Sequence, residues 1–249
     1  MCTMTTEMKQ DRVQVVMLEE GVENGLILGA HAPLQAVYEA AAVPNLLHYT
    51  LSGPVTWQIR NENTVISAVH SPNLAPQFVA ALLAWGARVL FDDEVGPILS
   101  EAEGTLADYL RGTLPHKDRF SAIRLPLAVH GRTWGESHVA RTPADAPIVA
   151  AIAVVDLNDD SAGELRPVVR QSRLAITGVW REHTRLAESA SLLVGGTLTD
   201  SRIQQVAAAV EQEVSPHDDY LGSSDYRRSM AAVLAWRALA DCMKGAKRA

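Results

Sequence analysis

The stretch IVAAIAVVDL, residues 148–157, is rich in β-branched residues and is followed by the turn-forming residues Asn158, Asp159 and Asp160. A short apolar run bounded by turn residues is typical of a β-strand. Three similar runs flank it, and they lie at residues 120–125, 133–139 and 168–177. Four successive strands with short connections predict an antiparallel meander.

Helices are predicted after these strands, because apolar residues recur there at helical spacing. The first is expected from about residue 181 to residue 193, before Gly195. The second is expected over residues 200–214, ahead of Pro216, and the third from about residue 224 to residue 243. The C-terminal part is therefore predicted to be a three- or four-stranded antiparallel sheet with three helices on one side.

The N-terminal part shows mixed patterns. Strands are expected at residues 13–18 and 26–28, and helices are expected to open at Pro33 and Pro76, since proline suits the first turn of a helix. Thr105 is positioned to cap a short helix, with Asp108 three residues further on.

The predicted fold class is thus α+β, in two parts. We expect residues 1–116 to form an α/β unit and residues 117–249 to form the sheet with three helices. The composition is 47% apolar over 249 residues, which is enough to bury a sizeable core.

Composition and charge exclude several classes of function. The net charge of −7 without a basic stripe argues against nucleic-acid binding. No apolar run approaches the length needed to cross a bilayer, and residues 1–12 lack the apolar stretch of a signal peptide. Cys2 and Cys242 stand near opposite ends and form no CxxC pair, so we expect a cytoplasmic protein without a disulfide framework.

Generic catalytic motifs are absent, and two local patterns are interpreted as structural. The chain contains no GxGxxG, GxxxxGK[ST], HExxH or GxSxG. Residues 193–197, LVGGT, look like a phosphate loop but are expected to end a helix. Asp156, Asn158 and Asp160 imitate the start of a calcium loop, yet position six is not glycine, so we predict a solvated hairpin turn and no metal site.

Several segments resemble, in order, the flavin-carrying medium subunit of carbon monoxide dehydrogenase and related molybdenum hydroxylases, a domain also present in xanthine dehydrogenases. The segments that carry the resemblance are GLILGA at residues 25–30, GPVTWQIRN at 53–61, LLAWGARV at 82–89, IRLP at 123–126, and a closing helix with Tyr226, Arg227 and Arg228. The resemblance implies that residues 1–116 are a remnant of the FAD-binding domain, its second subdomain. It implies that residues 117–249 are the family's C-terminal domain.

The departures from the family pattern concern the flavin. Family members carry a further N-terminal segment with a glycine-rich loop, whose N–H groups cradle the pyrophosphate, and here nothing precedes Met1. A second flavin segment, which reads ATIGGN in the family, here reads NTVISA at residues 63–68, so Ile66 and Ser67 replace the double glycine. A branched side chain then stands where backbone must approach the cofactor closely. We therefore expect no bound cofactor, and FAD binding is kept as the alternative.

The resemblance also assigns site residues. Arg60, Asn61 and Thr64 would be the remnant of the cofactor-binding segment, while His70, Ser71 and His138 would line a cleft between the two parts. We expect this cleft to be bounded by residues 60–71 and by strands of the C-terminal part. No catalytic residue is assigned, and no metal is expected.

Three functions stay open. The first is a flavin-poor, structural or interaction-mediating medium subunit that packs with molybdopterin and iron–sulfur subunits. The second is a stand-alone enzyme or binding protein that reuses the old flavin cleft for a small molecule. The third is an FAD-binding electron-transfer subunit, in which case the chain is an oxidoreductase subunit. A homo-oligomer is expected if Val65, Ile66 and Val69 form an apolar surface that needs covering.

Overall fold

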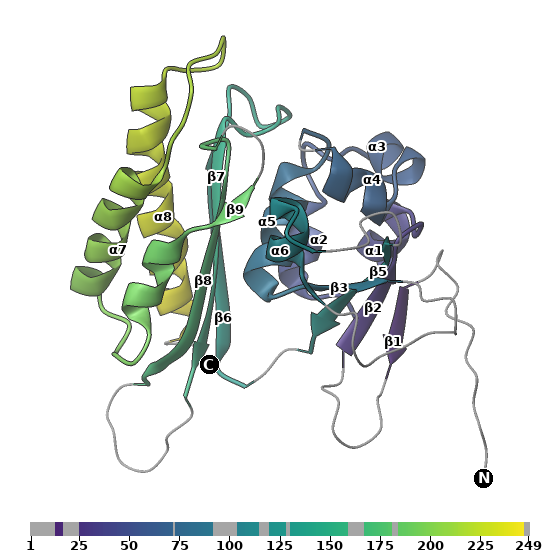
Figure 1. Cartoon of the computed structure of the whole chain (residues 1–249), viewed down its shortest axis with the longest axis horizontal. Helices are drawn as coiled ribbons and strands as arrows, with labels where there is room; N and C mark the ends of the chain where they lie inside the picture. Colours follow the sequence, from purple (N-terminus) through teal and green to yellow (C-terminus); the bar gives the residue numbers. More distant parts are fainter. Residues whose placement is uncertain are drawn as a thin grey trace.

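The computed structural model describes residues 13–16, 25–71, 73–91, 104–114, 120–127, 130–158, 167–180 and 184–246. In these ranges the strands form two antiparallel sheets, one of five strands and one of four. Figure 1 shows a group of helices beside the first sheet and two long helices on the outer face of the second. The predicted α+β fold class is confirmed by this arrangement.

The first sheet has the strand order β1-β2-β5-β3-β4. Its strands are β1 (Val13–Val16), β2 (Gly25–Gly29), β3 (Arg88–Phe91), β4 (Gly104–Thr105) and β5 (Phe120–Pro126). Leu26, Leu28 and Ile123 turn to one face and join a single apolar core with the helices there. These helices are α1 (Leu34–Glu39), α2 (Asn45–Thr50), α3 (Trp57–Glu62), α4 (Val65–His70), α5 (Pro76–Trp85) and α6 (Leu106–Arg111).

The second sheet has the strand order β6-β7-β8-β9. Its strands are β6 (Arg132–Val139), β7 (Val149–Leu157), β8 (Val169–Thr177) and β9 (Arg185–Leu186). The helices α7 (Asp200–Glu213) and α8 (Ser224–Ala246) and the 3-10 helix η2 (Glu188–Leu193) cover its outer face.

Strand β7 is buried along its whole length because both of its faces are covered. Ala151, Ala153 and Val155 turn toward α7 and α8. Ile152 and Val154 turn the other way and join the core of the first part. This double burial is why the sequence of β7 is an almost unbroken apolar run rather than an alternating one.

Helix α5 fills the space between the two sheets. Every residue from Gln77 to Trp85 is buried, and the helix packs against β7 and β8 as well as against the first part. A helix that is apolar all round is one buried on all sides. Because α5 joins the two parts through one continuous core, it also sets the positions of the residues that meet between them.

The predicted four-stranded meander is corrected at its first strand. Residues 120–126 pair with β2 and β3 of the first sheet, and the second sheet begins only at Arg132. The apolar pattern of a strand indicates which face is buried but does not name its neighbour. The division of the chain at residue 116 stays a prediction. Because β5 belongs to the first sheet, a boundary between the two parts would fall after residue 126 in this arrangement.

The first of the three predicted C-terminal helices is also corrected. Within the part of 181–193 that the structure describes, Arg185 and Leu186 pair with β8, and only Glu188–Leu193 forms a helix, of 3-10 type. Cross-strand pairing has overridden the helical spacing there. The short helices α2, α3 and α4 were not predicted, since six residues are too few to show a clear period.

The structural interpretation of LVGGT is supported. Gly195 follows the end of η2 with a φ of 76°, and its N–H donates to the carbonyl of Val169. Glycine tolerates this left-handed backbone. Over the residues described, no helix has both the length and the apolar character needed to cross a membrane.

Candidate functional site

Thr64, the centre of the remnant flavin segment, is a helix cap. Its side chain accepts a hydrogen bond from the Ser67 N–H, and its own N–H donates to the Ser67 hydroxyl at 2.8 Å. This reciprocal pair is a capping box, which closes the N-terminus of α4. The hydroxyl of Thr64 is therefore already used within the chain.

The backbone donors around Thr64 are used as well. Asn63 donates to the Ile59 carbonyl, and the N–H groups of Val65 and Ile66 donate to the carbonyls of Ala32 and Ala30 at 3.1 and 2.9 Å. Each N–H from residue 63 to residue 67 thus has a partner inside the chain. A pyrophosphate cradle needs such groups to point outward together. As arranged here, the segment does not fit a dinucleotide phosphate.

Arg60 and Asn61, the other two predicted cofactor residues, are occupied by structural contacts. The Arg60 guanidinium donates to the carbonyls of Leu51 and Val55 and lies 4.3 Å from the centre of the Tyr38 ring. It ties α3 to the loop after α2. Asn61 is exposed and donates to the Trp57 carbonyl of its own helix.

His70 and Ser71 lie at the exposed end of α4. One ring nitrogen of His70 is 2.6 Å from the Tyr109 hydroxyl, and the two rings stack. Burial lowers the pKa of His70 below its ordinary value. Ser71 caps the helix through its backbone N–H.

His138 lies on β6, on the face of the second sheet that meets the first part. Its Nδ1 is 2.9 Å from a Glu136 carboxylate oxygen, and the same oxygen accepts a hydrogen bond from Gln77 of α5. The hydrogen bond that His138 donates to the Glu136 carboxylate raises the pKa of His138, while burial lowers it. Arg141 and Asp145, which lie near His138 in the sequence, pair with each other at 3.6 Å.

None of these six predicted residues lines either of the two hollows described below. Val65 and Val69, expected at a covered surface, are buried in the core of their own part, and Ile66 packs against it. The roles proposed for the six residues stay predictions.

A cleft of about 490 Å³ lies at another position, between the two parts. Its lining residues come from the ends of α5, β3 and β5 and from the inner face of β6, β7 and β8. Its charged lining residues are Arg88, Arg124, Arg132, Arg170, Arg173 and Asp156. We call this hollow the arginine cleft.

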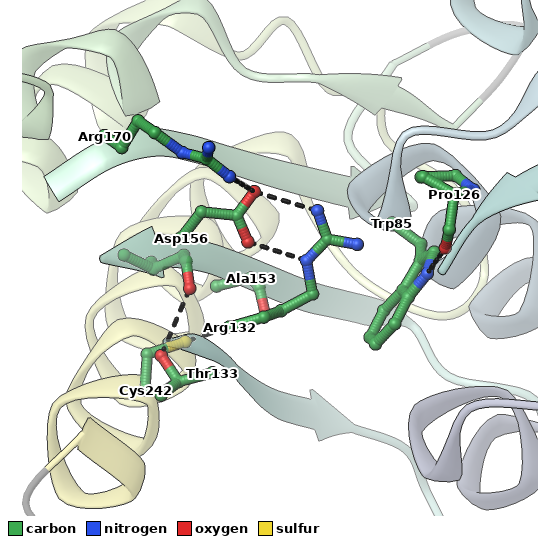
Figure 2. A network of polar contacts seen from close by, with 9 residues as sticks. Trp85, Pro126, Arg132, Thr133, Ala153, Asp156, Arg170 and Cys242 are labelled. Carbon is green, nitrogen blue, oxygen red and sulfur yellow. Dashed lines mark hydrogen bonds and ion pairs between the residues drawn. The ribbon is translucent and has the colours of Figure 1, made fainter. Parts of the chain in front are cut away.

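Asp156 is the centre of the arginine cleft, which corrects the prediction that it lies in a solvated turn. It is 2% exposed and stands opposite Arg132 in the pairing of β6 with β7. Arg132 donates to it through Nε at 2.6 Å and Nη2 at 2.8 Å, and Arg170 lies 4.0 Å away (Figure 2). Among the described residues, no cluster of three or more histidine, cysteine or acidic side chains could hold a metal.

Trp85 supports Arg132 from the side of the first part. The guanidinium carbon of Arg132 lies 4.8 Å from the centre of the Trp85 ring, a cation–π contact. The indole N–H donates to the Pro126 carbonyl at 2.9 Å, which holds the ring at the end of β5 (Figure 2). Cys242, drawn nearby, is buried beneath the sheet, and this burial raises the pKa of its thiol and makes it unreactive.

Arg173 closes the cleft from β8. Its guanidinium lies directly over Gly86, the left-handed residue that ends α5. Burial lowers the pKa of Arg173; Asp156 acts in the opposite direction, and repulsion from Arg132 and Arg170 lowers it further. Like charges have therefore been brought close together in a site that water reaches only in part.

Comparisons with known proteins show which proteins the chain resembles in sequence. Residues 137–242 match the family model of the CO dehydrogenase flavoprotein C-terminal domain. The chain is 24% identical to the glyceraldehyde dehydrogenase medium chain of Sulfolobus acidocaldarius, over 89% of this chain and 75% of that one. It is 24% identical to the carbon monoxide dehydrogenase medium chain of Hydrogenophaga pseudoflava, over 93% and 75%.

Solved structures share the fold. The carbon monoxide dehydrogenase of Hydrogenophaga pseudoflava superposes with a TM-score of 0.76 at 21% identity, covering 94% of this chain and 79% of that one. Quinoline 2-oxidoreductase of Pseudomonas putida 86 superposes with a TM-score of 0.72 at 18% identity, covering 94% and 78%. In sequence and fold the chain is thus similar to the medium subunits of molybdenum hydroxylases. The predicted resemblance to the FAD-binding medium chains typified by carbon monoxide dehydrogenase is confirmed.

Gly86→Ala should lower the free energy of unfolding by about 2 kcal/mol, from the left-handed backbone and from displacement of a packed group. Gly86 has a φ of 88°, and a Cβ there would meet the Arg173 guanidinium carbon at 2.9 Å. Urea unfolding followed by circular dichroism measures the loss.

Gly53→Ala is the matched control for this variant. Gly53 has a φ of 68°, but a Cβ there meets nothing within 4 Å, so only the backbone cost of about 1 kcal/mol should be seen. Equal losses for the two variants would mean that Arg173 moves aside freely.

His70 and His138 should titrate on opposite sides of 6.5, their ordinary pKa. The lowered pKa of His70 favours its neutral form in the fold, so its contribution to stability is lost as pH falls below 6.5. The raised pKa of His138 gives stability that is present below 6.5 and lost as pH rises through the folded pKa. NMR titration of the ring protons measures both.

Two variants separate the causes of these shifts. Glu136→Gln should bring the pKa of His138 down, because it removes the hydrogen-bonded charge. Tyr109→Phe should leave the pKa of His70 low, because burial and not the hydroxyl lowers it. If the pKa of His138 is unchanged in Glu136→Gln, the hydrogen bond to Glu136 is not what raises it.

Proposed function

We propose that this protein is a medium-subunit-like component of a molybdenum hydroxylase system whose role is structural or interaction-mediating and which holds little flavin. Similarity to medium chains extends over 89–93% of the chain in the relatives described above, which supports a shared place in such an assembly. Its partners are a molybdopterin subunit and an iron–sulfur subunit.

The absence of free donors around Thr64 is the observation that carries the flavin-poor part of the proposal. A dianionic pyrophosphate needs several N–H groups that point at it, and the groups from residue 63 to residue 67 are all engaged inside the chain. The Ile66 side chain lies against the apolar core of its own part, so freeing these donors would disturb packing as well.

The purified protein should show no flavin absorption between about 350 and 500 nm. The fluorescence of free FAD should not be quenched when the protein is titrated into it. The variant with Ile66→Gly and Ser67→Gly should behave alike, because the N–H groups at positions 65 and 66 stay bound to the carbonyls of Ala32 and Ala30. Stoichiometric FAD in the natural protein would refute the proposal and favour the electron-transfer subunit.

The partner part of the proposal is tested separately. The tagged full-length chain should retain a molybdopterin subunit and an iron–sulfur subunit through affinity and size-exclusion steps when the three are co-expressed. A chain that elutes alone would contradict this part. Light scattering in the same run measures whether the chain alone is a monomer or a homo-oligomer.

The arginine cleft favours a second candidate function, a stand-alone enzyme or binding protein that takes a small molecule between the two parts. Ligand sites commonly lie at such junctions, and a volume of about 490 Å³ suits a small molecule. This candidate predicts binding by the isolated chain, whereas the medium-subunit proposal predicts retention of the partner subunits.

A further inference from the structure

Most of the charged residues that the structure describes along the arginine cleft are positive. Among the described residues that line it, five are arginines and one, Asp156, is acidic. The whole chain, in contrast, has a formal net charge of −7. A cleft lined by one sign of charge focuses its field and raises the local concentration of ligands of the opposite sign.

Asp156 does not satisfy the guanidinium groups that face it. Both of its oxygens already accept from Arg132, through Nε and Nη2. The third nitrogen of Arg132, Nη1, is buried with no hydrogen-bond partner among the described residues, and the Arg132 side chain is only 5% exposed. Figure 2 shows this nitrogen pointing away from Asp156 and toward the space beside Trp85.

Arg173 repeats the pattern on the neighbouring side of the cleft. Its Nη1 is also buried without a hydrogen-bond partner in the described ranges. An unsatisfied donor on a buried charged group is costly, and buried polar groups in native proteins are nearly always paired. Two such donors on one cleft indicate that an acceptor belongs there.

We propose that the arginine cleft binds a phosphate group, with Arg132 and Arg173 as its principal donors. Guanidinium forks match phosphate oxygens and bind them through charge-assisted hydrogen bonds. Arg132 comes from β6 and Arg173 from β8, so their donors approach from two directions across β7. A tetrahedral group presents oxygens in several directions, whereas a carboxylate presents only two, in one plane.

The space around Arg132 allows the phosphate to be free or part of an ester. A second hollow of about 350 Å³ adjoins the cleft and shares Pro126, Leu127 and Arg132 with it. Trp85 and Trp134 line this second hollow. An apolar group esterified to the phosphate would lie against these indole rings.

Isothermal titration of the full chain with inorganic phosphate and with phenyl phosphate, at constant ionic strength in chloride, tests the proposal. We expect a Kd below about 1 mM for at least one of the two. Equal affinities indicate a site for free phosphate, and a tighter phenyl phosphate indicates an ester that uses the second hollow. Saturating ligand should also raise the Tm.

Three glutamine variants locate the binding. Arg173→Gln should weaken it at least about tenfold, since a charged donor is lost from a buried site. Arg170→Gln, at a side chain that is 55% exposed, should fold normally and weaken it about threefold. Arg141→Gln is the matched control in the loop between β6 and β7, with a side chain that is 61% exposed and lies outside the cleft, and it should leave the affinity unchanged.

The proposal fails if neither phosphate compound binds more tightly than chloride. It also fails if both bind but Arg170→Gln and Arg173→Gln leave the affinity as it was. Should Arg173→Gln not fold, Arg170→Gln decides, because Arg170 contributes charge from an exposed position. None of these results depends on whether the chain assembles with hydroxylase subunits.

Discussion

Asp156→Asn is expected to lower the free energy of unfolding by about 3–5 kcal/mol, the loss typical when one partner of a buried ion pair is removed. The variant keeps the shape of the side chain but removes its charge. Arg132 would then be a buried cation without a counter-ion, with Arg170 and Arg173 near it. Urea unfolding at pH 7 and low phosphate measures the loss.

Asp225→Asn is the matched control for this prediction. Asp225 pairs with Arg228 at 2.9 Å, but its side chain is 91% exposed. Exposed pairs contribute little because water and salt screen them, so a change within about 0.5 kcal/mol is expected. A loss at Asp156 no larger than the loss at Asp225 would show that water solvates Arg132 despite its burial.

Added phosphate should reduce the loss at Asp156 if the arginine cleft binds anions. The asparagine variant leaves more of the positive charge unopposed, so a bound anion stabilises it more than it stabilises the natural protein. One experiment therefore tests both the stability prediction and the binding proposal. The difference in the free energy of unfolding between the natural protein and Asp156→Asn should shrink as phosphate is added.

Local patterns in the sequence predicted those elements whose stability is decided locally. Proline at the start of α5 and the cap at Thr105 appear where the sequence analysis predicted them. The long helices α7 and α8 also appear near their predicted bounds, because each has enough turns to show a period. Helices of six residues, such as α3 and α4, are too short for the spacing of their apolar residues to show a helical period.

Pairing between distant segments could not be predicted in the same way. Strand β5 follows an apolar pattern that suits either sheet, and its place beside β2 depends on contacts across about a hundred residues. Residues 185 and 186 have helical spacing with the residues after them, yet they form β9, which pairs with β8. In both places tertiary contacts decide between structures that the local sequence allows.

The arginine cleft was missed for a related reason. Its five arginines are spread over four strands and only Arg170 and Arg173 share one, so no motif or spacing links them across the cleft. A signal was present, however. Arg124 interrupts the apolar run AIRL, and Arg173 interrupts SRLAI, at positions where a buried strand rarely carries a charge. Buried arginines in such strands indicate a functional or structural site even before their partners are known.

The six residues predicted as a site do not line the arginine cleft, because a resemblance in sequence transfers positions and not their surroundings. Thr64 keeps the position it would have in a flavin segment, but Ser67 in place of a glycine supplies the hydroxyl that completes a capping box. One substitution thereby changes Thr64 from a candidate ligand contact into a helix cap.

Gly135→Ala is expected to lower the free energy of unfolding by about 3 kcal/mol or more, at the upper end of the range for overpacked cores. Gly135 is buried on β6, where α8 crosses the sheet. A Cβ there would collide with the Ala238 carbonyl and lie 2.9 Å from the Asp241 Cβ. The obstruction is helix backbone, which cannot rotate away as a side chain does, so α8 as a whole must move off the sheet. Urea unfolding followed by circular dichroism measures the effect.

Gly245→Ala provides the control, since it adds the same methyl group to the same interface from the other side. Gly245 lies on α8, and a Cβ there would be 3.5 Å from the Thr133 Cβ, an ordinary contact. Alanine also favours a helix over glycine, so stability should stay the same or rise by up to about 1 kcal/mol. If both variants are tolerated, α8 is free to slide along β6, and the close approach at Gly135 does not fix its position. If only Gly135→Ala lowers the free energy of unfolding, the close approach of α8 to β6 at Gly135 fixes the position of the helices on the second sheet. It then also fixes the sheet whose inner face lines the arginine cleft.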